Sequence, residues 1–380
     1  MRGQLRGHAH LLAGWATVLA FALAGDELLG NLDPLLASLA LFAWILGVIL
    51  WCAFGVIEQA DALAELLGEP LGTLVLTFSI VVIEVMLISA VMLSGDANPT
   101  VGRDTMFAVM MIVLNGVVGL GLLVGGLRHG EQSYNLPGAA AYLAVIVPLS
   151  VIALVLPDAT ARADGTLTTF QAIAFSLFTI GLYGVFLAIQ TGRHRGFFVE
   201  AGSDGGAQAL SGEASGAATA ATPAAERPDR RAVARHTLLL VLSALPIVLL
   251  SRPLARVVDH GISALDAPVA LSGVLIALIV FTPEAVTALQ AAYRNELQRM
   301  VNLCLGAFVS TVGLTVPAIL MIGLVTGKTV VLGLDPSGVV LIALTLLVSM
   351  LTFSGPRTTV LEGAVHLLLF LVYLTLVFSP

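Results

Sequence analysis

The sequence predicts an all-α polytopic membrane protein of about eleven transmembrane helices, one leading helix followed by two inverted five-helix repeats. Of its 380 residues, 58% are hydrophobic and 11% are charged, with a mean hydropathy of +1.00. Soluble domains carry about 25% charged residues. The apolar residues form runs long enough to cross a bilayer, which takes about 20 residues. Two of these runs, 72–94 and 268–292, each hold a glutamate near the centre.

The first apolar run, 11–25, is the weakest of the set. It follows two arginines and ends in Ala22-Leu23-Ala24. These features fit a first transmembrane helix, and they also fit a cleavable signal peptide. Residues 1–34 are therefore assigned to an N-terminal segment, and both interpretations leave the next run starting outside the cell.

Ten stronger runs follow, and turn-forming residues separate them. Leu136-Pro137-Gly138 and Leu334-Asp335-Pro336-Ser337 are typical of such breaks, because proline and glycine end helices and form turns. Each run is read as one transmembrane helix. The predicted spans are 35–57, 72–94, 105–127, 138–156, 170–190, 236–258, 268–292, 300–325, 338–353 and 359–378.

A segment of different character divides these ten runs. Residues 200–235 are rich in Ala, Gly, Ser and Pro, without apolar periodicity, which is typical of a flexible linker. The predicted domains are therefore a first five-helix repeat over 35–199, the linker over 200–235 and a second five-helix repeat over 236–380.

The distribution of basic residues predicts a cytoplasmic N-terminus, because cytoplasmic loops carry an excess of Lys and Arg. With that orientation, twelve of the 17 basic residues lie inside and five outside. Half of the inside set flanks the linker, and without it the excess is only six to five. We expect an integral multi-pass protein of the bacterial inner membrane. The inside set is Arg2, Arg6, Arg128, Arg193, Arg195, Arg227, Arg230, Arg231, Arg235, Arg294, Arg299 and Arg357.

Glu84 and Glu284 are the candidate functional residues. A charged side chain at the centre of a span costs roughly 2.5–3.5 kcal/mol on insertion scales, so such residues are usually functional. In the predicted topology their helices are antiparallel and belong to opposite halves. Inverted-repeat transporters place their ion site at the midplane between the repeats. We therefore expect the two carboxyl groups to bind cations and protons together.

Neighbouring oxygen atoms complete the expected site. Thr282-Pro283-Glu284 has the pattern of a helix start inside a span, which predicts a broken helix with a free Ile279 carbonyl. Each hydroxyl could instead bond its own helix, and an asparagine could join neighbouring helices. The possible supporting ligands are Thr77, Ser79, Asn115, Thr282, Thr287 and Ser310.

Glu362 and His366 stand four residues apart in the last span, where two interpretations remain open. They could form a proton relay, or a structural pair near the membrane interface. The other six histidines lie at the ends of spans or in loops, so the sequence shows no metal cluster or nucleophile–base pair that an intramembrane enzyme would need. No basic face interleaved with aromatic residues indicates nucleic acid, and we expect neither an enzyme nor a resident cofactor.

Four stretches resemble the cation/proton exchanger (CAX) family of the calcium–cation exchanger superfamily, and are most similar to its bacterial ChaA-type calcium/sodium/potassium–proton antiporters. The likeness runs from about residue 35 to the end of the chain, apart from the linker. The stretches are GEPLGTLVLTFSIVVIEVMLISAVMLSGDANPTVGRDT (68–105), LYGVFLAIQT (182–191), FTPEAVTALQAAYRNELQRMVNLCLGAFVSTVGLTVP (281–317) and SGPRTTVLEGAVHL (354–367).

The resemblance implies eleven spans and one essential acid in the signature helix of each repeat, here Glu84 and Glu284. It also implies that Asn115 and Ser310 are their polar neighbours. The sequence departs from the calcium exchangers, which carry Gly-Asn ahead of each glutamate. Ile80-Val81 and Phe281-Thr282 stand at those places, so two amide ligands are missing.

Taken together, these features predict a Ca²⁺/H⁺ antiporter, with a Na⁺(K⁺)/H⁺ antiporter as the alternative. The two negative charges of the carboxylates neutralise a divalent ion, whereas a monovalent ion leaves one charge unpaired, which is costly in an apolar site. The missing amides argue the other way, because Ca²⁺ takes about 6–8 oxygen ligands. The expected partners are the lipid bilayer and the transported ions.

Overall fold

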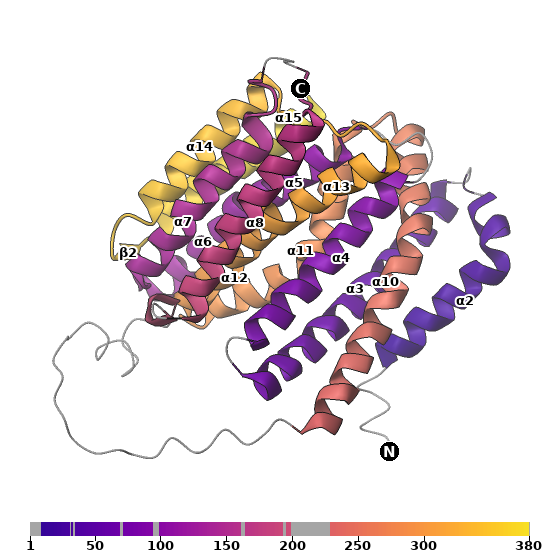
Figure 1. Ribbon diagram of the computed structural model, residues 1–380, viewed down its shortest axis with the longest axis horizontal. Helices are drawn as coiled ribbons and strands as arrows, with labels where there is room; N and C mark the ends of the chain where they lie inside the picture. The colour runs from indigo at the N-terminus through magenta and orange to yellow at the C-terminus, as the bar shows by residue number, and fades with distance from the viewer. Residues whose placement is uncertain are drawn as a thin grey trace.

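The computed structural model describes residues 9–30, 32, 35–68, 71–93, 99–160, 164–192, 195–198 and 229–379. Almost all of the predicted linker lies outside these residues. The described part is a bundle of long helices that lie roughly side by side (Figure 1). The predicted all-α membrane fold is confirmed.

A leading helix and a first group of five continuous helices occupy the N-terminal half. The third helix of the group contains a π-helical segment, and the fourth ends in one. The bounds are α2 (Ala9–Gly30), α3 (Leu35–Leu67), α4 (Leu71–Leu93), α5–η1–α6 (Val101–Met110, Met111–Val117, Val118–His129), α7–η2 (Leu136–Ser150, Val151–Val155) and α8 (Thr169–Thr191), followed by the short 3₁₀ helix η3 (Arg195–Phe198).

The second group has the same order of helices. Its third helix again contains a π segment, η4, at the corresponding place. The bounds are α10 (Arg230–Ala264), α11 (Ala270–Tyr293), α12–η4–α13 (Leu297–Ser310, Thr311–Thr315, Val316–Thr326), α14 (Pro336–Thr352) and α15 (Val360–Phe378).

Nine helices among the described residues are long and apolar enough to cross a membrane. The other two, α14 and the part of α4 from Phe78 to Ser89, are apolar but shorter. Together these make eleven helices, the number that the sequence predicts. Several boundaries differ from the prediction: α3 extends to Leu67 and not 57, and α10 ends at Ala264 and not 258. Helix α10 also begins at Arg230 and not at 236, because the side chain of Asp229 caps it by accepting a hydrogen bond from the Arg231 N–H at 3.0 Å.

The first helices of the two groups, α3 and α10, pack against each other (Figure 1). The leading helix α2 packs on both of them at one edge of the bundle. The Trp15 indole N–H donates to the Leu242 carbonyl at 3.1 Å, and the His10 ring bonds the Ser243 hydroxyl at 3.1 Å. The signature helices α4 and α11 contact each other inside the bundle. These contacts place the central glutamates between the two groups.

A small clamp joins two loops on the same face of the molecule. Strands β1 (Gln132–Ser133) and β2 (Arg357–Thr358) pair antiparallel, with Gln132 opposite Thr358. The hydroxyl of Tyr134 donates to the Gly355 carbonyl, and Arg357 forms an ion pair with Glu131 at 2.7 Å. The clamp therefore connects the α6–α7 loop of the first group to the α14–α15 loop of the second.

The predicted break at Thr282-Pro283-Glu284 is wrong. Helix α11 is continuous from Ala270 to Tyr293, with Pro283 inside it. Thr282 does not cap a helix start, because its hydroxyl donates back to the Leu278 carbonyl at 2.5 Å. Proline is tolerated within packed membrane helices, where neighbouring groups can bond the carbonyl that it leaves free.

Candidate functional site

Glu84 and Glu284 are both buried in the middle of their helices. Glu84, on α4, is 1% exposed, and Glu284, on α11, is 5% exposed. Helices α4 and α11 contact each other, and Ile83 and Leu87, which lie next to Glu84 on α4, line the same small cavity as Glu284. The structure thus brings together the two acids that the sequence singles out, one from each five-helix group.

Two threonines from the opposite group contact Glu84. The hydroxyls of Thr311 and Thr315 each donate to its Oε2 atom, both at 2.9 Å. They lie in the π segment η4, which packs against α4. A π turn inserts an extra residue into the helix and often marks a functional site. Thr311 and Thr315 stand four residues apart, so both hydroxyls lie on one face of the helix and reach the same carboxyl oxygen.

The second oxygen of each glutamate has no hydrogen-bond partner among the described residues. These atoms are Oε1 of Glu84 and Oε2 of Glu284. Glu284 borders a cavity of about 10 Å³, whose remaining wall is formed by apolar side chains. The wall consists of Ile49, Ala53, Ile57, Ile80, Ile83, Leu87, Ile279, Val280 and Pro283.

No basic side chain among the described residues neutralises either glutamate. The ion pairs there join Arg103 with Asp104, Arg299 with Glu296, and Arg357 with Glu131. A buried charge is costly unless it is paired or coordinated. A proton or a cation is therefore the natural partner of each carboxyl group.

No cluster of three or more His, Cys, Asp and Glu that could hold a metal occurs in the described part of the chain. A cation between the two glutamates would draw its remaining ligands from hydroxyl, carbonyl and water oxygens. Carboxylate and hydroxyl oxygens suit hard cations. The arrangement can therefore bind either a hard cation or protons.

Four of the hydroxyl groups that the sequence suggested as ligands bond the backbone of their own helices. Ser79 donates to the Val75 carbonyl at 2.7 Å, and Ser310 donates to the Ala307 carbonyl at 2.7 Å. Thr287 donates to the Pro283 carbonyl at 3.0 Å, and Thr282 to the Leu278 carbonyl. The side chain of Thr77 lies outside the described residues. The hydroxyl contacts of Glu84 thus come from positions one and five residues after Ser310.

Asn115 takes part in a separate buried network. Its Nδ2 donates to the Thr345 hydroxyl at 2.8 Å, and its Oδ1 bonds the His366 ring at 3.0 Å. The other ring nitrogen of His366 bonds the Thr352 hydroxyl at 3.0 Å. This network joins η1, α14 and α15, as expected for an asparagine that connects helices.

Glu362 and His366 do not hydrogen-bond each other. The Glu362 carboxylate accepts from the backbone N–H of Thr359 at 2.8 Å and from its hydroxyl at 2.5 Å. Thr359 and Glu362 form a capping box at the start of α15, which satisfies backbone donors at the helix terminus. A direct relay between the two side chains would require Glu362 to leave this cap, whereas the structural interpretation agrees with the contacts.

Sequence reasoning missed Thr311 and Thr315. A signal for them exists in the internal repeat. Glu84 and Glu284 are 200 positions apart, and the same offset places Thr315 at the counterpart of Asn115. The two π segments, η1 and η4, begin at Met111 and Thr311, with that same offset. Aligning the halves on the glutamates would have selected Thr315 and not Ser310.

Curated proteins similar to this chain cover nearly its whole length. The putative ionic transporter y4hA of Sinorhizobium fredii is 39% identical over 345 residues, 90% of each chain. The sodium-potassium/proton antiporter ChaA of Escherichia coli is 36% identical over 362 residues, 91% of this chain and 95% of the relative. A Ca²⁺/H⁺ antiporter of Aphanothece halophytica is 23% identical over 83% of both chains.

Solved exchangers share the fold. The structure of native YfkE superposes with a TM-score of 0.71, covering 98% of this chain and 100% of its own, at 16% identity. The H⁺/Ca²⁺ exchanger CAX superposes with a TM-score of 0.65, covering 97% of this chain and 88% of its own, at 14% identity. The family profile described as sodium/calcium exchanger protein matches residues 37–192 and 235–379, which are the two five-helix groups. The chain therefore belongs to the sodium/calcium exchanger protein family.

Proposed function

We propose that this protein is a secondary active antiporter that exchanges Ca²⁺ for protons, and that both compete for Glu84 and Glu284. One observation carries the proposal: two buried carboxyl groups lie on helices of the two five-helix groups that contact each other inside the bundle, and each has an oxygen without a partner among the described residues. Inverted-repeat transporters bind their ions at such a midplane site.

Competition for the same oxygens explains coupling. A cation that arrives from one side displaces the protons, and protons that arrive from the other side release the cation. The form with two bare carboxylates is unfavourable in an apolar interior. Only the loaded and the protonated forms then pass readily through a closed state, and this restriction couples the two fluxes.

Charge balance favours Ca²⁺ as the cargo. Two carboxylates neutralise one divalent ion, and exchange for two protons leaves the charge of the site unchanged. The Thr311 and Thr315 hydroxyl oxygens, which retain lone pairs while donating to Glu84, are available as further ligands. The names of the Aphanothece relative and of the CAX structure agree with this cargo.

Na⁺ or K⁺ exchange for protons is the second candidate. The Escherichia coli relative, 36% identical, is named a sodium-potassium/proton antiporter. The glutamate helices also lack the Gly-Asn pair of the calcium exchangers, which removes two amide oxygens. A site with fewer oxygens suits an ion that needs fewer ligands.

Everted vesicles with a preformed pH gradient distinguish the two cargoes. We expect Ca²⁺ in the micromolar range to dissipate the gradient before Na⁺ or K⁺ in the millimolar range does. The monovalent ions should act more strongly as the pH rises, because fewer protons compete. Vesicles that carry Glu84→Gln and Glu284→Gln together are the control for leakage.

If Na⁺ or K⁺ dissipates the gradient and Ca²⁺ does not, the calcium assignment is wrong, while exchange at the two glutamates stands. If no cation moves protons in vesicles that contain correctly inserted protein, the antiport proposal itself is refuted.

A further inference from the structure

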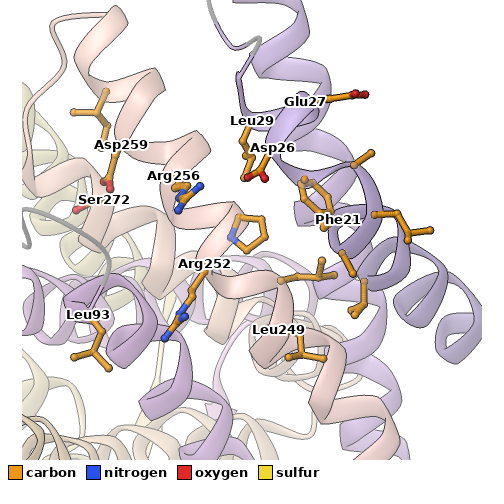
Figure 2. Close-up of a pocket in the computed structure, with 18 of the residues that line it drawn as sticks. Phe21, Asp26, Glu27, Leu29, Leu93, Leu249, Arg252, Arg256, Asp259 and Ser272 are labelled. Carbon is orange, nitrogen blue, oxygen red and sulfur yellow. The ribbon is translucent and has the colours of Figure 1, made fainter.

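A large cavity lies apart from the glutamates, between the leading helix α2 and the second half of α10. Its volume is about 1330 Å³ (Figure 2). Val18, Phe21 and Leu249 contribute apolar wall, and charged side chains surround the remainder. In the predicted orientation this cavity, the basin, opens on the outer side of the membrane.

The charged groups of the basin are arranged unevenly. Asp26 and Glu27 lie on α2, with Arg252, Arg256 and Asp259 on α10. Figure 2 shows Asp26 and Arg256 directed towards each other, Glu27 directed away, and Asp259 next to Ser272 of α11. The formal charges of these five side chains sum to −1. None of them forms an ion pair with another described residue.

Asp259 stands where the basin continues towards the glutamates. Asp259 and Ser272 also line a second cavity, of about 10 Å³. Leu87 and Ile279 line both that cavity and the third one, which Glu284 borders. The three cavities therefore form a row that leads from the basin to Glu284.

The inner part of this row is closed. Each of the two inner cavities has room for about one water molecule. Leu87 is 3% exposed and Ile279 is 4% exposed, and their side chains are apolar. Apolar constrictions stop ions by excluding water. Leu87 follows Glu84 by three residues on α4, and Ile279 precedes Glu284 by five on α11, so a shift of either helix would change both site and constriction.

We propose that this row is the access route to the glutamate site from one side of the membrane, with Asp259 as the residue that attracts cations at its mouth. Leu87 and Ile279 form its gate. The inference rests on the proposed antiport and adds a residue that determines how cations reach the site. A negative charge at the mouth of a low-dielectric cleft raises the local concentration of cations. Arg256, one turn away on the same helix, opposes this effect.

Transport measured separately from the two membrane faces tests the route. Asp259→Asn removes the charge and keeps the shape of an exposed side chain. We expect it to raise the cation KM about threefold on the basin side and to leave the KM on the other side unchanged. Arg256→Gln should lower the KM on the basin side. A merely structural defect would not change KM in opposite directions.

Three controls sharpen the result. Asp266→Asn removes an equal charge from an exposed position seven residues further on, outside the basin lining, and should have little effect. Asp259→Glu keeps the negative charge and should therefore have the wild-type cation KM on the basin side. High salt should shrink the difference between wild type and Asp259→Asn, because the Debye length falls to about 3 Å at 1 M ionic strength.

The route is overturned if wild-type protein exchanges cations while Asp259→Asn matches it from both faces, or changes KM equally on both. If wild-type protein exchanges nothing from either face, the proposed antiport fails, and the route fails with it.

Discussion

Glu84 and Glu284 occupy equivalent places in the two halves, yet their immediate contacts differ. Glu84 accepts hydrogen bonds from two threonine hydroxyls, whereas the counterparts of those threonines are Met111 and Asn115. The Asn115 side chain bonds Thr345 and His366. The two acids therefore have unequal hydrogen-bond environments.

Neutralising either glutamate should abolish exchange. Glu84→Gln and Glu284→Gln keep the shape of the side chain and remove the group that a proton or cation occupies. We expect loss of cation-dependent proton movement in vesicles, with normal insertion into the membrane. Glu131→Gln, which removes only an exposed ion pair worth at most about 1 kcal/mol, should transport normally. Near-normal exchange by either central variant would remove that glutamate from the mechanism.

The two η4 threonines should contribute to cation affinity. Thr311→Val with Thr315→Val removes both hydroxyls from Glu84 with little change in volume. A hydrogen bond to a charged group is worth about 1.5–3 kcal/mol, so we expect the cation KM to rise about tenfold or more. Serine at both positions should restore the affinity. Ser310→Ala, in the same helix but bonded to its own backbone, should behave like wild type; an equal effect of Ser310→Ala would contradict the assignment.

Among the elements, α6 and α15 pack unusually closely through glycines. A Cβ atom at Gly363 would lie 2.5 Å from the Leu123 backbone nitrogen and 2.8 Å from the Gly119 carbonyl oxygen. Gly363→Ala should therefore force the helices apart and destabilise the fold by about 1–3 kcal/mol. Thermal unfolding in detergent measures this loss. Gly181→Ala on α8 is the matched control, because no other atom lies within 4 Å of its Cβ position.

The clamp between the α6–α7 and α14–α15 loops offers a prediction of pH dependence. Burial, with a further contribution from the charge of Glu362, raises the pKa of Tyr134 to about 12. Since the pKa in the folded state exceeds that in the unfolded chain, the stabilisation is fully present below about pH 10 and is lost as the pH rises towards 12. Tyr134→Phe should lower stability by about 1 kcal/mol at neutral pH.

Unfolding measured across pH checks this expectation. The difference in stability between wild type and Tyr134→Phe should stay constant up to about pH 10 and shrink above it. A difference that already changes between pH 6 and pH 9 would show that another group, and not the tyrosine hydroxyl, governs the clamp.

At the scale of the whole molecule, the predicted orientation is the main expectation to test. Residues 200–235 should face the cytoplasm, since six of the 17 basic residues lie within this segment or just before it. Protease should cut this segment in everted vesicles and not in right-side-out vesicles. Removing residues from the part that precedes α10, 200–228, should leave transport intact, because the sequence predicts neither a span nor a ligand there. Cleavage from the outer face alone would reverse the orientation, and with it the side on which the basin opens.

The sequence by itself determined the number of helices and the two acids around which they are arranged. Apolar runs of about 20 residues have few structural alternatives in a bilayer, because every backbone polar group must be bonded internally. A carboxyl group in the middle of such a run is too costly to be incidental. Glu84 and Glu284 could therefore be identified without any tertiary information.

Only the tertiary structure decided which polar side chains reach those acids. In a span that is apolar on every face, hydropathy does not show which side of the helix points inward, so Ser310 seemed as plausible as its neighbours. The packing of η4 on α4 brings Thr311 and Thr315 to Glu84. The pairing of Asn115 with His366 likewise depends on a contact between distant helices, which local sequence does not encode. The continuity of α11 through Pro283 was also visible only in the structure.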